Sequence, residues 1–249
     1  TFEEFFDAYK KQMEYCISLM VNADNAIDVA HAERVPLPYE SCMVDDCLSR
    51  GLSVQEGGAV YNFTGPQGFG IANMADSLYA IRKLVYEDKK VSMEEYKQAL
   101  AWNYDKGLDQ QSVSDMSEMI LKGMQDAGMA VNTDTAKAVL QTVMRLKPTE
   151  DQLRRFTEIH HMIDEVPKFG NAIDDVDYFA RDVAYTYSRP LQKYMNPRVG
   201  HYQAGLYPVS ANVPLGGQTG ATPDGRYAHT PVADGVSPSA GKDVKGPTA

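Results

Sequence analysis

The sequence contains only three cysteines, one tryptophan and no long uninterrupted apolar run. Because Cys16, Cys42 and Cys47 are odd in number and include no CxxC pair, we expect neither a disulfide framework nor a zinc site, and a reducing compartment fits best. No apolar stretch approaches the roughly 20 residues that a membrane-spanning helix needs. The sequence therefore predicts no membrane segment.

Basic residues are also scarce, because 24 lysines and arginines stand against 34 aspartates and glutamates, and the formal net charge is −10. A nucleic-acid-binding surface would require clustered basic side chains, so no nucleic-acid partner is predicted. The 249 residues have room for one large domain or two ordinary ones. The chain lacks an initiator methionine and opens on an amphipathic, charged stretch, so we expect it to be an internal piece of a longer protein.

Most of the chain has helical periodicity. Capping-box pairs predict helix starts at Thr1, Ser92 and Thr149. The first helix has an apolar face with helical spacing, formed by Phe5, Tyr9, Met13, Ile17 and Met20. Further helices are expected over 72–87 (with Met74, Leu78, Ile81 and Val85 on one stripe), as two short helices within 104–148, and over 171–195 (with Ile173, Val176, Phe179, Val183 and Tyr187 inward), where Pro190 predicts a kink.

A short helix is predicted near residue 41. Ser41 would cap it and Gly51 would end it. The inward residues would be Met43, Val44, Cys47 and Leu48. On this basis Cys42 and Cys47 are expected to be packing residues rather than reactive thiols.

Two segments have the character of strands. The run "GGAVYNF" (57–63) is β-branched and aromatic between glycines, and "YQAGLYPVSANV" (202–213) places Tyr207, Val209 and Ala211 on one face. The chain after Pro214 is expected to be loop, with "TPDGR" (222–226) as a turn. Two strands separated by a large helical insertion predict an α/β layout whose neighbouring strands lie outside this chain.

The loop "TGPQGFG" (64–70) lies between the first predicted strand and a helix. Glycines before a helix could expose backbone N–H groups to a phosphate, but the loop fits neither GxGxxG nor the P-loop pattern. A strand-to-helix turn beside a pocket is the favoured interpretation. Gln67 and Phe69 are then candidate wall residues of that pocket.

No catalytic constellation is evident from the residues alone. His160 and Asp164 share a helix face and could hold a metal, but His161 points about 100° away, so one packed and one solvated histidine is favoured and no metal is predicted. Ser210 lacks the GxSxG context of hydrolases.

Four long stretches resemble the glycyl radical enzymes of the pyruvate formate-lyase-like family. They are "LMVNADNAIDVAHAERVPLPYESCMVDDCLSRG" (19–51), "EGGAVYNFTGPQGFGIANMADSLYAIRKLVYE" (56–87), "YQAGLYPVSANVPLG" (202–216) and "TPDGRYAHTPVADGVSPSAGKDVKGPTA" (222–249). The nearest branches are the glycerol and propanediol dehydratases and the choline trimethylamine-lyases. Each stretch is far more specific than a short motif.

The resemblance implies an α/β fold, part of a ten-stranded α/β barrel, in which residues 1–249 supply mostly outer helices and a few barrel strands. The whole chain would be a fragment of the catalytic domain. It contains neither the Gly-Cys-x-Glu loop with the radical cysteine and the glutamate base nor the RVxGYS-like motif with the radical glycine. No catalytic residue is therefore expected within it, and this fragment alone is expected to be inactive.

The resemblance further implies a glycyl radical lyase that eliminates water from glycerol or propane-1,2-diol. A choline trimethylamine-lyase, a formate acetyltransferase, and a non-catalytic relic or partner protein are the alternatives. No cofactor would bind directly, since a separate activating enzyme that uses S-adenosylmethionine and an iron–sulfur cluster installs the radical. By the same resemblance Tyr207 and Val209 line the substrate cavity.

The resemblance also implies a place for the full-length protein. It would be a homodimer in the cytoplasm of an anaerobic bacterium, with a bacterial microcompartment as an alternative setting. Its partners would be a small-molecule substrate and the activating enzyme.

Overall fold

The computed structural model describes residues 1–108, 110–144 and 146–246. Within these ranges the chain is helical, in the order α1 (Phe2–Arg34), α2 (Pro38–Met43), α3 (Cys47–Arg50), α4 (Ile71–Ile81), α5 (Met93–Ala101), α6 (Gln110–Asp126), α7 (Thr133–Met144), α8 (Glu150–Glu165), α9 (Asp174–Leu191) and α10 (Asn212–Gly217). A 3₁₀ turn occupies Val54–Glu56, and α4 continues into a π-helical turn at Arg82–Glu87. None of the described helices is long and apolar enough to cross a membrane.

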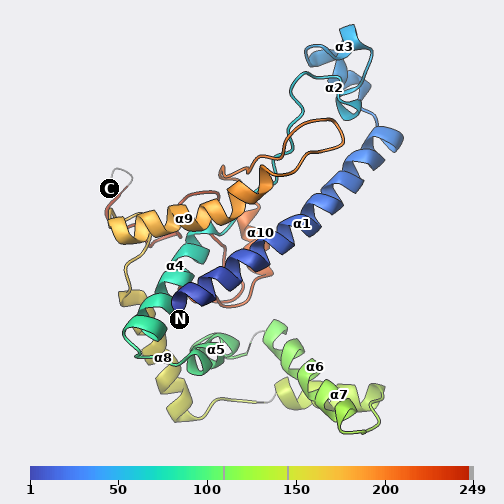
Figure 1. The fold of residues 1–249 in the computed structure, drawn as a ribbon. Coiled ribbons are helices and arrows are strands. Elements are labelled where there is room, and N and C mark those ends of the chain that lie inside the picture. Colours follow the sequence, from blue (N-terminus) through green and yellow to red (C-terminus); the bar gives the residue numbers. More distant parts are fainter. Residues whose placement is uncertain (109, 145, 247–249) are drawn as a thin grey trace.

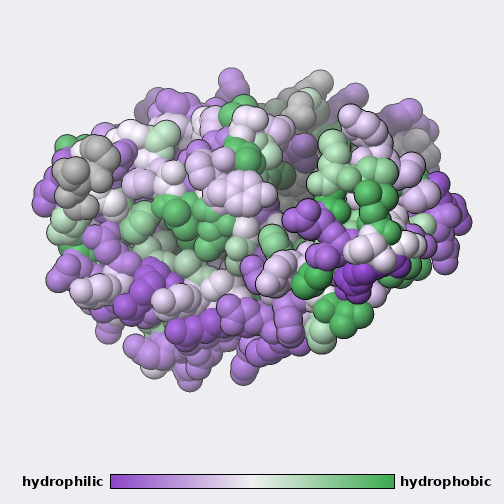
Figure 2. All heavy atoms as spheres, turned by 90° about the horizontal axis from the view of Figure 1, so that it is seen from above, coloured by the Kyte–Doolittle hydropathy of each residue, from purple (hydrophilic) through white to green (hydrophobic). Residues whose placement is uncertain are grey.

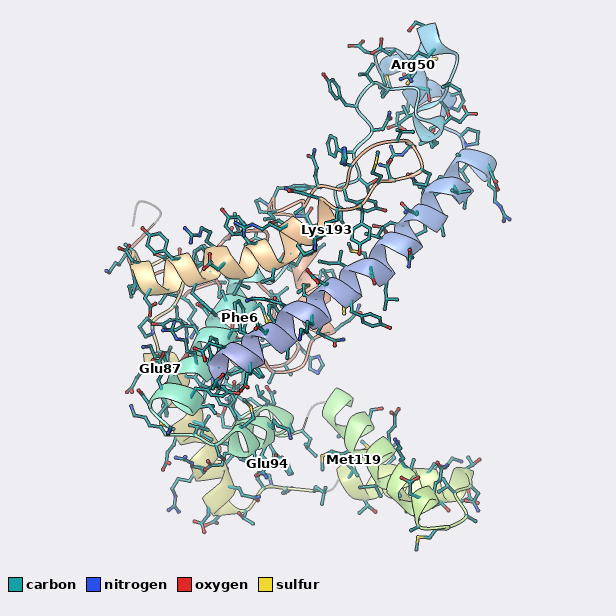
Figure 3. All side chains as sticks on the ribbon, in the orientation of Figure 1. Phe6, Arg50, Glu87, Glu94, Met119 and Lys193 are labelled. Carbon is teal, nitrogen blue, oxygen red and sulfur yellow. The ribbon has the colours of Figure 1, made fainter. Side chains whose placement is uncertain are left out.

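The centre of the molecule is the crossing of α4 with α9, against which α1 packs (Figure 1). Ala75 and Leu78 of α4 meet Ala180 and Val183 of α9 in one buried cluster. Phe6 lies between α1 and α9, where its ring centroid is 5.4 Å from that of Phe179 (Figure 3). The first part of α1 is therefore held by aromatic packing.

A second core lies where α5 and α8 pack beside the end of α4. Its fully buried side chains include Tyr96, Tyr104, Phe156, Ile159 and Ile163. The α6–α7 hairpin stands apart from this core, and Met119 on α6 is exposed there (Figures 1 and 3).

The helix starts predicted from capping boxes are confirmed. The side chains of Thr1, Ser92 and Thr149 each accept a hydrogen bond from the backbone three residues on, and the glutamate or glutamine at that position reaches back. The two short helices within 104–148 are confirmed by α6 and α7. In the TPDGR turn Gly225 N donates to Thr222 O, and Gly225 has a φ of +93°, as the sequence predicts.

The strand expected over 57–63 is wrong. Tyr61 is 87% exposed, and Val60 and Phe63 are also exposed. Two backbone carbonyls of this segment are already occupied, because the Arg50 guanidinium donates to Gly58 O and Ala59 O. A strand would need those groups for a neighbouring strand.

The strand expected over 202–213 is reduced to two parallel bridges, Thr64 with Tyr202 and Gln67 with Gly205. No longer ladder occurs in the described part of the chain, so the barrel is not formed by this chain alone. The pairing stops before Pro208, which has no N–H to donate. The expectation of loop after Pro214 is confirmed over 218–246, which contain no helix or strand. It fails only at 215–217, because Pro214 lies in the first turn of α10, where a missing N–H costs nothing.

Two smaller expectations about helices are corrected. Ser41 lies inside α2 rather than capping a helix, and a break at 44–46 separates α2 from α3. Cys47 is buried as expected, but Cys42, Met43 and Leu48 are exposed, since two short helices cannot keep one continuous inward face.

The predicted kink at Pro190 does not occur. The helix begins at Asp174 instead of residue 171 and ends at Leu191, one residue after the proline. Because Pro190 lies in the last turn, the helix ends there instead of continuing with a bend.

On the long helix 72–87 the stripe is partly wrong, because Met74 is exposed while Leu78 and Ile81 are buried. Most of α4 is buried, including its polar residues Asn73, Asp76 and Ser77. These buried polar groups require internal partners.

Candidate functional site

The glycine-rich segment 219–246 runs back across α4 and past α8 and approaches the start of α9 (Figure 1). Asn73 on α4 holds it at three points: Nδ2 donates to Asp224 Oδ2 (2.6 Å) and Ser239 Oγ (3.0 Å), and Oδ1 accepts from Ala233 N (2.7 Å). Asn73 is only 5% exposed. One buried amide therefore fixes three parts of a segment that has little regular structure.

Asp224 links the segment to itself and to α4. Its N–H donates to Ser77 Oγ at 3.1 Å, and its Oδ1 accepts from Thr222 Oγ1 and from Arg226 N. The carboxylate is thus surrounded by donors although the residue is buried. Such contacts compensate for the desolvation of the carboxylate.

The Arg226 guanidinium closes the loop that surrounds it. It donates to four main-chain carbonyls, those of Thr219, Gly220, Tyr227 and Thr230. Burial lowers the pKa of Arg226, and the neighbouring Asp224 carboxylate opposes that shift. The planar fork of arginine suits this bridging role, because its donors diverge in fixed directions.

Helix α5, the turn that follows it and helix α8 hold the TPDGR turn from the other side. Tyr96 donates its hydroxyl to Pro223 O at 2.6 Å, Tyr104 donates to Thr222 O at 2.8 Å, and His160 Nε2 lies 2.8 Å from Gly225 O. The carbonyl can only accept, so Nε2 carries the proton. His160 is thus packed and its Nε2 is occupied.

His161, in contrast, is exposed. The expectation of one packed and one solvated histidine is therefore confirmed. No group of three or more potential metal ligands occurs among the described residues.

Asp76 is a buried carboxyl group, 1% exposed, on the α4 face that meets the start of α9. Its Oδ1 accepts from Phe169 N at 2.8 Å, whereas Oδ2 has no hydrogen-bond partner within the described structure. Burial raises the pKa of Asp76 to about 7, and the amide of Phe169 and the charge of Lys168 oppose that shift. Lys168 donates to Ile163 O, and burial lowers the pKa of its ammonium.

The candidate wall residues come from two neighbouring segments. Gly68 N donates to Gly205 O (2.8 Å), Gly205 N donates to Pro66 O (2.9 Å), and the Gln67 side-chain amide donates to Tyr207 O. Tyr207 is 58% exposed and Val209 38%. The structure therefore brings Gln67 and Tyr207 together and leaves the side chains of Tyr207 and Val209 open.

In the loop 64–70 two of the glycine amides that a phosphate cradle would use are already hydrogen-bonded. Gly68 N is bonded to Gly205 O and Gly70 N to Ala233 O, both at 2.8 Å. An anion would have to displace these carbonyls. The loop is a turn that leads into α4.

Two hollows flank this turn. One of about 250 Å³ is lined by Gln67 and Phe69, and one of about 500 Å³ is lined by Phe69, Asn73 and Thr222. Phe69 therefore lines both. Tyr207 and Val209 lie outside both linings.

Sequence reasoning did not identify Asn73, Asp224 and Arg226. A signal was present for the first of them, since "IANMADSLYAI" places Asn73, Asp76 and Ser77 at helical spacing within an otherwise apolar helix. The partners of Asn73 lie more than 150 residues away, so the pairing itself carried no local signal.

Comparisons with known proteins agree over the length of the chain. A model of the family described as pyruvate formate lyase-like matches residues 1–216. The probable dehydratase YbiW of Escherichia coli is 35% identical, and trans-4-hydroxy-L-proline dehydratase of Clostridioides difficile is 28% identical. Each alignment covers 100% of this chain and 26% of the relative, so the chain spans about a quarter of the length of these curated relatives.

Solved structures extend this likeness. A structure concerned with 1,2-propanediol dehydration in Roseburia inulinivorans is 62% identical with a TM-score of 0.93, covering 100% of this chain and 30% of that one. The glycerol-bound B12-independent glycerol dehydratase of Clostridium butyricum is 44% identical with a TM-score of 0.74, covering 100% and 25%.

Proposed function

Because the chain belongs to the pyruvate formate lyase-like family, we propose that it is part of a longer glycyl radical lyase that eliminates water from a small diol. The observation that carries this proposal is the 62% identity, over the whole chain, to a protein described for 1,2-propanediol dehydration. Propane-1,2-diol is therefore the first substrate to test. Glycerol is the second, from the 44% identity to a glycerol dehydratase.

The exposed apolar side chains support a larger protein. Large hydrophobic side chains are open on several segments, and a space-filling view shows hydrophobic patches on one face (Figure 2). The exposed side chains include Val60, Tyr61, Phe63, Tyr207, Val213 and Leu215. Large exposed apolar patches usually mark an interface. We place the rest of the barrel against the exposed apolar side chains of these segments.

In this proposal a glycine of the longer protein stores the radical and a cysteine receives it. The radical would supply the chemistry that removes a hydrogen atom from the substrate. We assign both residues to the rest of the longer protein, because none of Cys16, Cys42 and Cys47 has a Gly-Cys-x-Glu context and these 249 residues contain no RVxGYS-like motif. The overall conversion of propane-1,2-diol into propanal and water balances in atoms and electrons without an added oxidant or reductant. We propose that the full-length protein is a homodimer and that a separate activating enzyme installs its radical.

The contribution of this chain is one wall of the substrate cavity. Tyr207 offers a hydroxyl that can orient a diol, and Val209 offers an apolar surface beside it. Gln67 fixes the Tyr207 carbonyl, and Phe69 lines both hollows beside the turn. A wall of this composition would keep water from a radical intermediate while leaving one polar group for the substrate.

The test is turnover by the longer protein after anaerobic activation with its activating enzyme. We expect a glycyl radical signal in electron paramagnetic resonance and formation of propanal from propane-1,2-diol, with slower turnover of glycerol. Protein left without activation is the control and is expected to give neither. Cleavage of choline to trimethylamine, or of pyruvate with coenzyme A, while both diols remain untouched would contradict the proposal.

A further inference from the structure

We propose that Gly235 is a positioning residue that sets the place of the Tyr207 backbone, and with it the substrate wall; this inference rests on the proposed function. Gly235 is buried and has a φ of +49°. A Cβ at this position would lie 2.7 Å from Leu206 O, 2.8 Å from Tyr207 C and 3.0 Å from Pro208 N. The backbones of the two segments touch, and only glycine permits this approach.

The segment that carries Gly235 is fixed from the side of α4. Ala233 N donates to Asn73 Oδ1 (2.7 Å), and Ala233 O accepts from Gly70 N (2.8 Å). Both partners belong to α4 or its N-terminal turn, which is part of the packed centre of the molecule. The segment therefore cannot retreat easily from a bulkier residue.

The start of α10 holds the same segment. Asn212 Nδ2 donates to Val232 O at 2.9 Å, and Val232 N donates to Asn212 O at 3.3 Å. Gly235 thus lies three residues after Val232. The two hydrogen bonds between Val232 and Asn212 join this segment to the chain just after Val209. The segment 232–235 is a spacer between α4 and residues 206–212.

Tyr207 is held less firmly than the spacer. Its carbonyl accepts from the Gln67 amide, a side-chain contact, and its own side chain is 58% exposed. When a methyl group replaces the Gly235 hydrogen, the strain is expected to move residues 206–208. The displacement is roughly half an ångström or more, the shortfall from ordinary van der Waals contact.

The matched control is Gly241, which also has a positive φ, +77°, but where a Cβ would meet nothing within 4 Å. Gly235→Ala and Gly241→Ala incur the same kind of left-handed backbone strain. Only the first adds the contact with Tyr207. The difference between the two variants therefore isolates the close approach.

In the activated longer enzyme, Gly235→Ala is expected to raise the KM for propane-1,2-diol and lower kcat/KM about 10- to 100-fold, because a misplaced wall weakens substrate positioning. The glycyl radical yield should be unchanged. Gly241→Ala should stay within about twofold of wild type. Equal kinetic constants for Gly235→Ala and wild type would overturn the proposal.

Two further measurements separate the possible failures. Asn212→Ala removes a contact to the spacer without adding bulk, and we expect it to raise KM several-fold. An unchanged KM for this variant overturns the proposal even if Gly235→Ala does not fold. If wild-type enzyme does not turn over diols, the proposed function fails. Gly235 is then judged by the crystal structure of Gly235→Ala, where an unmoved Tyr207 backbone overturns the positioning role and a shifted one supports it.

Discussion

Replacing Asn73 with leucine is expected to accelerate hydrogen exchange of segment 219–246 by about a hundredfold or more. Leucine has the same branched heavy-atom skeleton but leaves Asp224 Oδ2, Ser239 Oγ and Ala233 N without their partner. Each unsatisfied buried group costs about 1–3 kcal/mol, so the three groups together should cost about 3–9 kcal/mol. Because about 1.4 kcal/mol corresponds to a factor of ten, the opening of the segment becomes far more frequent.

The measurement is hydrogen exchange by mass spectrometry on the longer enzyme. Asn132→Leu is the control, since the exposed Asn132 side chain accepts from Thr135 within the hairpin. We expect it to affect α7 by about 1 kcal/mol and segment 219–246 not at all. An unchanged exchange pattern in 219–246 for Asn73→Leu would mean that the amide does not hold this segment.

The wild-type protein is expected to lose stability as the pH rises towards 7.5. The Asp76→Asn variant is expected not to show this loss. The pKa of Asp76 is raised by burial to about 7 in the folded chain, against 3.8 as its ordinary value. Between these values the folded state binds more protons than the unfolded state, so the free energy of unfolding falls with increasing pH. From pH 5.5 to 7.5 the expected loss is about 2 kcal/mol, at 1.36 kcal/mol for each pKa unit.

Asparagine keeps the acceptor for Phe169 N and replaces the unpartnered Oδ2 with an uncharged group. Exchange of the α4 amides, corrected for the intrinsic rate at each pH, should therefore lose its pH dependence in the variant. Asp175→Asn is the control, because the hydroxyl of Tyr79 lowers the pKa of Asp175 and its effect is confined to more acidic solution. If Asp76→Asn kept the wild-type slope, the carboxyl would not be the responsible group.

Features that depend on neighbouring residues could be predicted from the sequence. A capping box needs only residues three positions apart, so the starts of α1, α5 and α8 followed directly from Thr1, Ser92 and Thr149. The TPDGR turn belongs to the same class, because proline, aspartate and glycine set its backbone locally.

Features that depend on distant partners could not be predicted. A strand exists only when another strand accepts its hydrogen bonds, and the patterns at 57–63 and 202–213 do not say which segment does so. Asn73 and Asp224 lie far apart in the chain, so only the fold shows that they form a buried pair. The candidate wall residues Gln67 and Tyr207 are brought together in the same way.

The measurement that tests this account most directly is the crystal structure of the longer enzyme with propane-1,2-diol bound. We predict a hydroxyl of the diol within hydrogen-bonding distance of the Tyr207 hydroxyl, contact with the Val209 side chain, and Gly235 against the Tyr207 backbone. A diol bound in a chamber to which no residue of the segment 202–213 contributes would contradict the account.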